Sequence, residues 1–112
     1  MSIQEIQQVE LSIEQAKEMI AQADSVERLY KNRDFKKVIL EGYFEKEPVR
    51  LVKAKANPAL ATEETQNRID KEIIGIGILE QYFYKTLTLG NQAKNSLVEY
   101  ESMLEELRNE TE

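Results

Sequence analysis

Residues 73–84 read IIGIGILEQYFY, and the structure that this stretch adopts decides the fold. Its glycines, Gly75 and Gly77, are spaced as in a nucleotide-binding loop, while its β-branched residues are typical of a strand. The same residues also fit a helix, because apolar side chains recur at intervals of three and four residues. Each interpretation leads to a different kind of protein.

The nucleotide-loop and strand interpretations both fail. A dinucleotide-binding loop follows a strand and has a third glycine three residues after the second. That position is Glu80, and the preceding TEETQNRIDKE is typical of a helix. No Gly-Lys-Ser or Gly-Lys-Thr follows, so a P-loop is excluded. Apolar residues cover nearly all sides of residues 69–84 when these are plotted as a helix, which predicts a helix buried on several sides.

The two glycines need a reason inside such a helix. Each costs about 1 kcal/mol relative to alanine in a helix interior. We predict that Gly75 and Gly77 let the backbone of a crossing helix approach closely. Leucine at either position would then overpack the contact, at a cost of about 1 to 3 kcal/mol each.

The apolar pattern of this helix extends well beyond residues 73–84. It predicts a helix over about residues 63–108, roughly 65 Å long at 1.5 Å per residue, with Thr62 as its N-cap. A seam at alternating three- and four-residue steps contains Ile69, Ile76, Leu79, Phe83, Thr86, Gly90, Ala93, Leu97, Tyr100, Leu104 and Leu107. A loop over residues 57–62 precedes the helix, because Asn57 is followed by Pro58 and is biased away from helix.

Two further helices are predicted before this loop. The first spans about residues 3–31, with a narrow seam at Ile6, Val9, Ile13, Ala16, Ile20 and Ala23. The second spans about residues 34–56 and begins at Asn32 or Asp34, either of which can cap a helix. Pro48 lacks an amide hydrogen, so we expect a kink or a short break near Glu47.

The chain is therefore predicted to be all-α: a single domain of residues 1–112, forming an elongated three-helix hairpin or bundle with a long C-terminal coiled-coil-like helix. The first helix, at about 40 Å, covers only part of the third. The rest of the third helix either bends at Gly90 to close a monomeric bundle or meets a second chain, and we favour a homo-oligomer. The predicted packing and oligomer interface contains Ile69, Ile73, Gly75, Ile76, Gly77, Leu79, Phe83, Leu97 and Leu104.

Composition excludes most catalytic chemistry. The 112 residues include no cysteine and no histidine, so disulfides, thiolate nucleophiles, the commonest general base and the commonest metal ligand are missing. Paired acids occur only at ordinary helical spacing. We expect no catalytic site, no metal and no cofactor. The N-terminal MSIQEIQQVE lacks the features of a leader, and no apolar run is long enough to span a membrane, which predicts a soluble protein of a reducing cytoplasm.

The net charge of −6 is unevenly distributed. Residues 32–56 are basic, whereas the segments before and after them are acidic, which favours packing of the basic segment between two acidic ones. The alternative is a face that contacts an anionic partner, formed by Arg33, Lys36, Lys37, Arg50, Lys53 and Lys55. The isoelectric point near 4.8 argues against nucleic acid as that partner.

Three stretches carry a family resemblance: NRDFKKVILEGYFEKEPVRLV (residues 32–52), the loop ANP, and TQNRIDKEIIGIGILEQYF (residues 65–83). Together they resemble small helical proteins of tailed bacteriophages, most of which have no assigned function. The resemblance lies in hydrophobic and glycine positions and carries over no functional residue.

This resemblance implies a bacteriophage setting, with the chain in the host cytoplasm or the virion. We expect a structural or assembly protein, as a virion accessory, scaffold-like or neck-associated component, that acts by helix association and contacts other phage structural proteins. The alternative is a small regulator that binds a host protein or nucleic acid through the basic face of the second helix.

Overall fold

A computed structural model describes residues 2–111, and it confirms the all-α fold with a long C-terminal helix. No strand occurs within this range. The elements in chain order are α1 (Ser2–Lys31), α2 (Arg33–Phe35), the π-helix η1 (Lys36–Lys46), α3 (Glu47–Lys55), the short 3₁₀ turn η2 (Pro58–Leu60) and α4 (Glu63–Thr111). The longest element, α4, contains 49 residues.

The chain divides into two compact units, and the single domain expected from the sequence stays a prediction. Unit 1 combines residues 1–27 with residues 85–112, and unit 2 consists of residues 28–84. Both α1 and α4 contribute to the two units. We describe each unit separately.

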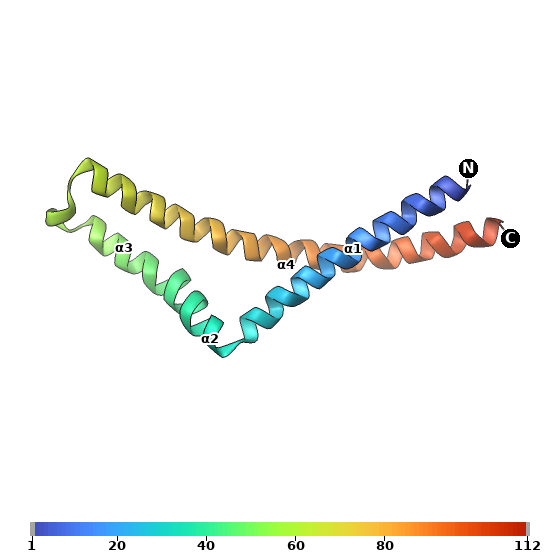
Figure 1. Cartoon of the computed structure of the whole chain (residues 1–112), viewed down its shortest axis with the longest axis horizontal. Coiled ribbons are helices and arrows are strands. Elements are labelled where there is room, and N and C mark those ends of the chain that lie inside the picture. The colour runs from blue at the N-terminus through green and yellow to red at the C-terminus, as the bar shows by residue number, and fades with distance from the viewer. Residues whose placement is uncertain (1, 112) are drawn as a thin grey trace. The chain divides into compact units, whose positions relative to one another are not determined.

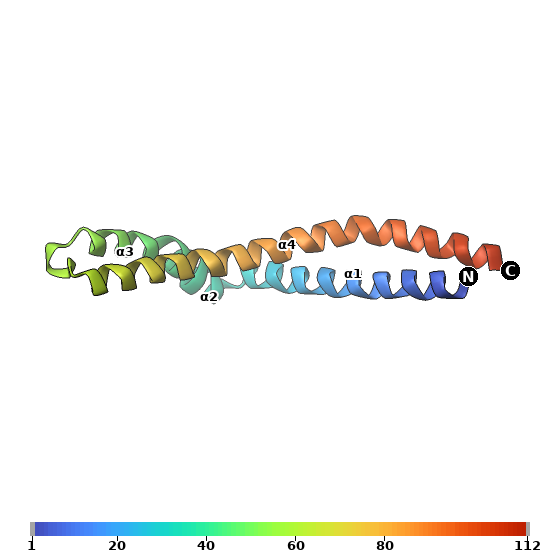
Figure 2. The same ribbon diagram turned by 90° about the horizontal axis from the view of Figure 1, so that it is seen from above.

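In unit 1, α1 and the C-terminal part of α4 run side by side in opposite directions (Figures 1 and 2). Their shared core contains Val9, Ile13, Ala16, Ala23, Val26, Thr86 and Ala93, of which the first five belong to α1. Ile6 and Ile20 are half-buried at the edge of this core. The seam predicted from α1 is therefore the face that packs.

Unit 2 has a core of larger side chains. Its centre is formed by Leu51 of α3 with Ile69 and Ile76 of α4, and Leu51 is only 2% exposed. Tyr43, Phe44, Ala54 and Ile73 pack around them. In the figures α3 and the N-terminal part of α4 lie next to each other as a hairpin (Figure 2).

The interruption predicted near Pro48 takes the form of a π-helix. The chain does not break at Glu47, whose φ of −63° and ψ of −44° are helical. Instead, residues 36–46 are wound more widely, and the Glu47 amide donates to the Gly42 carbonyl, five residues back. A proline ring clashes with the carbonyl four residues before it in an α-helix. A preceding π segment changes that register, so the helix continues through Pro48.

Side-chain caps fix the ends of the helices. The Asn32 side chain accepts a hydrogen bond from the Phe35 amide at 2.9 Å, so Asn32 and not Asp34 begins the second helical segment. Thr62 accepts from the Thr65 amide at 3.3 Å, as predicted for the start of α4. The Asn57 side chain accepts from the Ala59 amide at 3.0 Å. Each cap satisfies an amide that has no partner within its helix.

The loop before α4 is held by a residue that sequence reasoning missed. The Gln66 side-chain amide donates to the Lys55 carbonyl at 3.1 Å and to the Leu60 carbonyl at 2.9 Å. One side chain thereby joins the end of α3, the turn η2 and the first turns of α4. Nothing in the local sequence distinguishes Gln66 from a surface glutamine, because both carbonyls come from outside its helix.

Candidate interaction surfaces

The stretch at residues 73–84 lies in α4 of unit 2, and one side of it is open to solvent. We call this side the outer face; it contains Lys71, Ile74, Gly75, Gly77, Ile78, Gln81, Tyr82 and Tyr84. Ile74 is 60% exposed, Ile78 61% and Tyr84 73%. Only the opposite side, with Ile69, Ile76 and half-buried Phe83, packs against the rest of the unit. The prediction that this helix is buried on several sides is wrong for a single chain.

Gly75 and Gly77 do not admit a crossing helix of the same chain. A β-carbon built on either glycine has no neighbouring atom within 4 Å. The close approach predicted at these positions occurs instead at Gly90 in unit 1, where a β-carbon would lie 2.2 Å from the β-carbon of Ala23 and 3.3 Å from the Met19 carbonyl oxygen. Gly90 therefore lies in a tight helix seam, where α4 continues as a helix through residues 90 and 91.

Apart from Gly75 and Gly77, the predicted interface residues fall into three groups. Ile69 and Ile76 are buried inside unit 2, and Ile73 and Phe83 are half-buried there. Leu97 and Leu104 are half-buried in unit 1. Leu79 is 36% exposed. Most of this set is therefore used within the chain, and whether any of it contacts a second chain stays a prediction.

The aromatic residues of unit 2 gather mainly around Phe83. Its ring centroid lies 5.7 Å from that of Phe35, and 6.1 Å from those of Tyr30 and Phe44. Burial, and secondarily the negative charge of Glu80, raise the pKa of Tyr30 above its ordinary value of 10.0. These edge-on and tilted pairs are typical of aromatic packing in a core.

The six basic residues proposed as an anionic-partner face do not all remain available. Arg50 pairs with Glu47 one helical turn earlier in the same segment, and Lys55 pairs with Asp70 of α4 at 2.7 Å. Arg33, Lys36, Lys37 and Lys53 are exposed. The Lys55–Asp70 pair agrees with packing of the basic segment against an acidic one.

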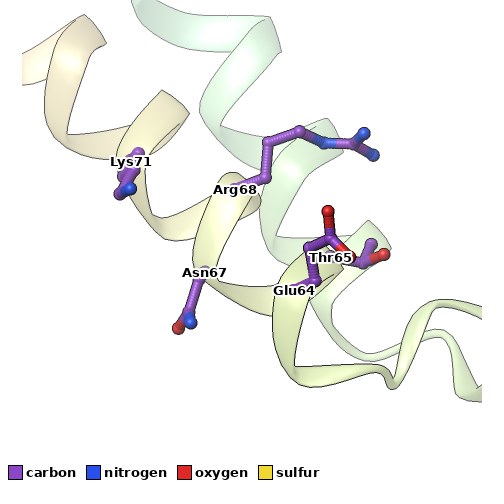
Figure 3. Close-up of a pocket in the computed structure, with 5 residues that line it drawn as sticks. All are labelled: Glu64, Thr65, Asn67, Arg68 and Lys71. Atoms are coloured by element: carbon purple, nitrogen blue, oxygen red, sulfur yellow. The ribbon is translucent and has the colours of Figure 1, made fainter.

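A hollow at the start of α4 has no convergent polar groups. Glu64, Thr65, Asn67, Arg68 and Lys71 line it, all from neighbouring turns of one helix. Figure 3 shows Arg68 and Asn67 pointing to opposite sides of the helix. A ligand site needs polar groups that converge on a common point. This hollow does not provide them.

Among residues 2–111, no group of three or more acidic side chains lies in an arrangement that could hold a metal ion. In the same range, no helix is both long and apolar enough to cross a membrane.

Comparison of the chain with models of protein families, with curated proteins and with solved structures gives no match. The resemblance of residues 32–52 and 65–83 to small phage proteins therefore stays a prediction. Among the surfaces described above, the outer face of α4 exposes the large apolar side chains Ile74, Ile78, Tyr82 and Tyr84.

Proposed function

We propose that this chain is a non-enzymatic structural or assembly protein that acts by helix–helix association. The observation that carries the proposal is the number of large apolar side chains left open on its helices. Among the described residues, more of these side chains are exposed than buried, including Ile3, Val38, Val49, Ile74 and Val98 at 53% exposure or more. On α4, Ile74 and Ile78 lie one helical turn apart and are 60% and 61% exposed, so that open apolar side chains adjoin each other there. Adjoining apolar side chains at a surface favour contact with another protein.

The two units support the proposal in a second way. Unit 1 pairs two helices around small residues such as Ala16, Ala23 and Ala93, and a helix pair of this kind leaves much of each helix open to solvent. Helices with open apolar residues gain stability by packing against further helices.

For the setting we propose a bacteriophage, with the chain as a virion accessory, scaffold-like or neck-associated component, located in the virion or in the host cytoplasm. Support comes from the resemblance of the middle of the chain to small phage proteins. The proposed partners are further copies of the chain and other phage structural proteins.

Detection of the chain in purified virions tests this function. We expect mass spectrometry of purified particles to find the chain at a fixed ratio to the major structural proteins, and to find it after a high-salt wash, since apolar contacts resist salt. An accessory or neck role predicts a low ratio. Two results together would contradict the proposal: the chain is never detected in purified particles, and particles made without it form and infect normally.

The regulator hypothesis predicts a different result. A regulator that uses the basic residues Arg33, Lys36 and Lys37 would bind a host protein or nucleic acid, and its affinity would fall steeply with salt. A pull-down from host lysate at two salt concentrations separates the two hypotheses. Two of the six basic residues already form ion pairs within the chain, which is why we favour the structural role.

A further inference from the structure

We propose that the outer face of α4 pairs with the same face of a second copy of the chain, antiparallel and about a twofold axis level with residue 76. This inference rests on the proposed function. It identifies a second copy of the chain as one partner and the outer face of α4 as the surface through which the two copies bind. The whole face lies in unit 2. Three features of this face favour the pair: the spacing of its exposed residues, the free space at its glycines, and its charges.

The spacing of the outer face is that of a helix-pairing seam. Lys71, Ile74, Ile78 and Gln81 follow each other at steps of three, four and three residues, which is the pattern of the core positions in a coiled coil. This seam is distinct from the one that carries Ile69 and Ile76 on the inner side. Ile74 and Ile78, at 60% and 61% exposed, stand in its middle. One helix therefore presents two seams, and only the inner one is covered within the chain.

The glycines lie on the two flanks of this second seam. Gly75 follows Ile74, Gly77 precedes Ile78, and a β-carbon at either would meet no atom within 4 Å. Glycine at flanking positions lets the backbone of a neighbouring helix come close, because no side chain separates the two. Among residues 2–111, no helix approaches either glycine this closely, although Gly75 also borders a hollow next to Leu51 of α3. In the proposed pair, Gly75 lies beside the partner's Gly75, and Gly77 beside the partner's Gly77.

The charges select the antiparallel direction. A parallel pair in register places Lys71 against the partner's Lys71, and like charges at a core position oppose pairing. The antiparallel pair places Lys71 opposite the partner's Gln81 and Ile74 opposite the partner's Ile78. Arg68 on the flank then lies beside the partner's Tyr82, where an exposed guanidinium and a half-exposed ring form a favourable contact.

The twofold arrangement repeats every one of these contacts. Since residue and partner exchange roles across the axis, the Ile74–Ile78 contact occurs twice in each pair. The apolar part is nevertheless short, with two isoleucines from each chain. We therefore expect a weak pair whose population rises with protein concentration, in the class of small interfaces.

Cysteine cross-linking tests the direction of the pair. The natural chain has no cysteine, so an introduced one is the sole thiol. The variants Ile74→Cys and Ile78→Cys are prepared separately with tags of different size, mixed and oxidised. We expect the mixed disulfide between positions 74 and 78 as the main product, because a disulfide requires the two Cα atoms to lie within about 7 Å. A parallel pair would give 74–74 and 78–78 products, which would overturn the proposal.

A charge substitution tests whether the face is used at all. Glutamate in Ile78→Glu would be buried without a partner, so the dissociation constant measured by light scattering should rise about 10- to 100-fold. The matched control is Val98→Glu, which introduces the same charge on the same helix at a side chain that is 70% exposed. Circular dichroism should show both variants folded. Equal dissociation constants for the two variants, or a wild-type chain that stays monomeric at millimolar concentration, would overturn the proposal.

These results are separable from the test of the proposed function. If the chain is found in virions but the 74–78 cross-link does not form, the pairing is wrong and the structural role stands. If the cross-link forms and the chain is absent from virions, the pairing stands and the structural role in the particle is wrong.

Discussion

Units 1 and 2 use glycine in opposite ways within one continuous helix. In unit 1, Gly90 is buried, and a β-carbon there would overlap Ala23. In unit 2, Gly75 and Gly77 face open space, although IIGIGILEQYFY is far more apolar than the sequence around Gly90. The difference teaches that apolar neighbours in sequence do not identify a close helix contact. What identifies it is a small residue on the facing helix.

The two units also differ in the size of the side chains that form their cores. The core of unit 1 is a seam of small and β-branched residues, including Ala16, Ala23 and Ala93, which brings the two backbones close together. The core of unit 2 is built from Leu51, Ile69 and Ile76 with aromatic rings at its edge. Unit 1 should therefore be sensitive to added atoms, and unit 2 to removed atoms.

The largest effect is expected in the core of unit 2. Leu51→Ala should lower the free energy of unfolding by about 2 to 5 kcal/mol, because it removes a fully buried side chain and leaves a cavity. Urea denaturation measures the loss, and hydrogen exchange shows whether it is confined to residues 28–84. The matched control is Val52→Ala, next in sequence but 59% exposed, which should change stability by less than about 0.5 kcal/mol. Equal losses in the two variants would contradict this description of the core.

The next effect is expected at the tight seam of unit 1. Gly90→Ala should destabilise by about 1 to 3 kcal/mol, because its β-carbon would lie 2.2 Å from that of Ala23 and the two helices must separate. Removing the opposing atom with Ala23→Gly in the double variant should recover part of the loss. Thermal melts of the four proteins give the coupling between the two sites. A coupling near zero would show that the helices do not meet there.

The opposite sign is expected at the glycines of unit 2. Gly75→Ala and Gly77→Ala should each stabilise the chain by about 0.5 to 1 kcal/mol, since alanine favours helix and its methyl group meets nothing. The measurement belongs at a protein concentration low enough to keep the chain monomeric. Destabilisation of both variants at that concentration would contradict the open space at these glycines. It would instead support the close helix crossing that was predicted from the sequence.

The smallest effect concerns Tyr30 at high pH. Because its pKa is raised in the folded chain, Tyr30 keeps its proton at pH values where the unfolded chain loses it. The stability it contributes is therefore fully present below pH 10 and is lost as pH rises through the folded pKa. Tyr30→Phe should remove this part of the decline in stability above pH 10. Denaturation at a series of pH values compares the slopes, and identical slopes in both proteins would contradict the raised pKa.

Much of the secondary structure could be predicted from the sequence. The all-α fold, the inward seam of α1 from Val9 to Ala23 and the cap at Thr62 follow from spacing and capping chemistry. The π-helical segment could not be predicted, because Pro48 is compatible with either a kink or a wider winding of the residues before it. The hydrogen bonds from the Gln66 side chain to the Lys55 and Leu60 carbonyls could not be predicted either, because these acceptors lie outside the helix that contains Gln66.

The sequence by itself determined that IIGIGILEQYFY is helical and is not a dinucleotide-binding loop, because the motif lacks a preceding strand and its third glycine. Only the tertiary structure decided which side of that helix is covered, since Ile73, Ile74, Ile76 and Ile78 are equally apolar and differ only in direction. Ile73 and Ile76 pack with Leu51 of α3, whereas Ile74 and Ile78 are exposed. The physical reason is that periodicity fixes which residues share a face, whereas contact with the rest of the chain fixes which face is buried.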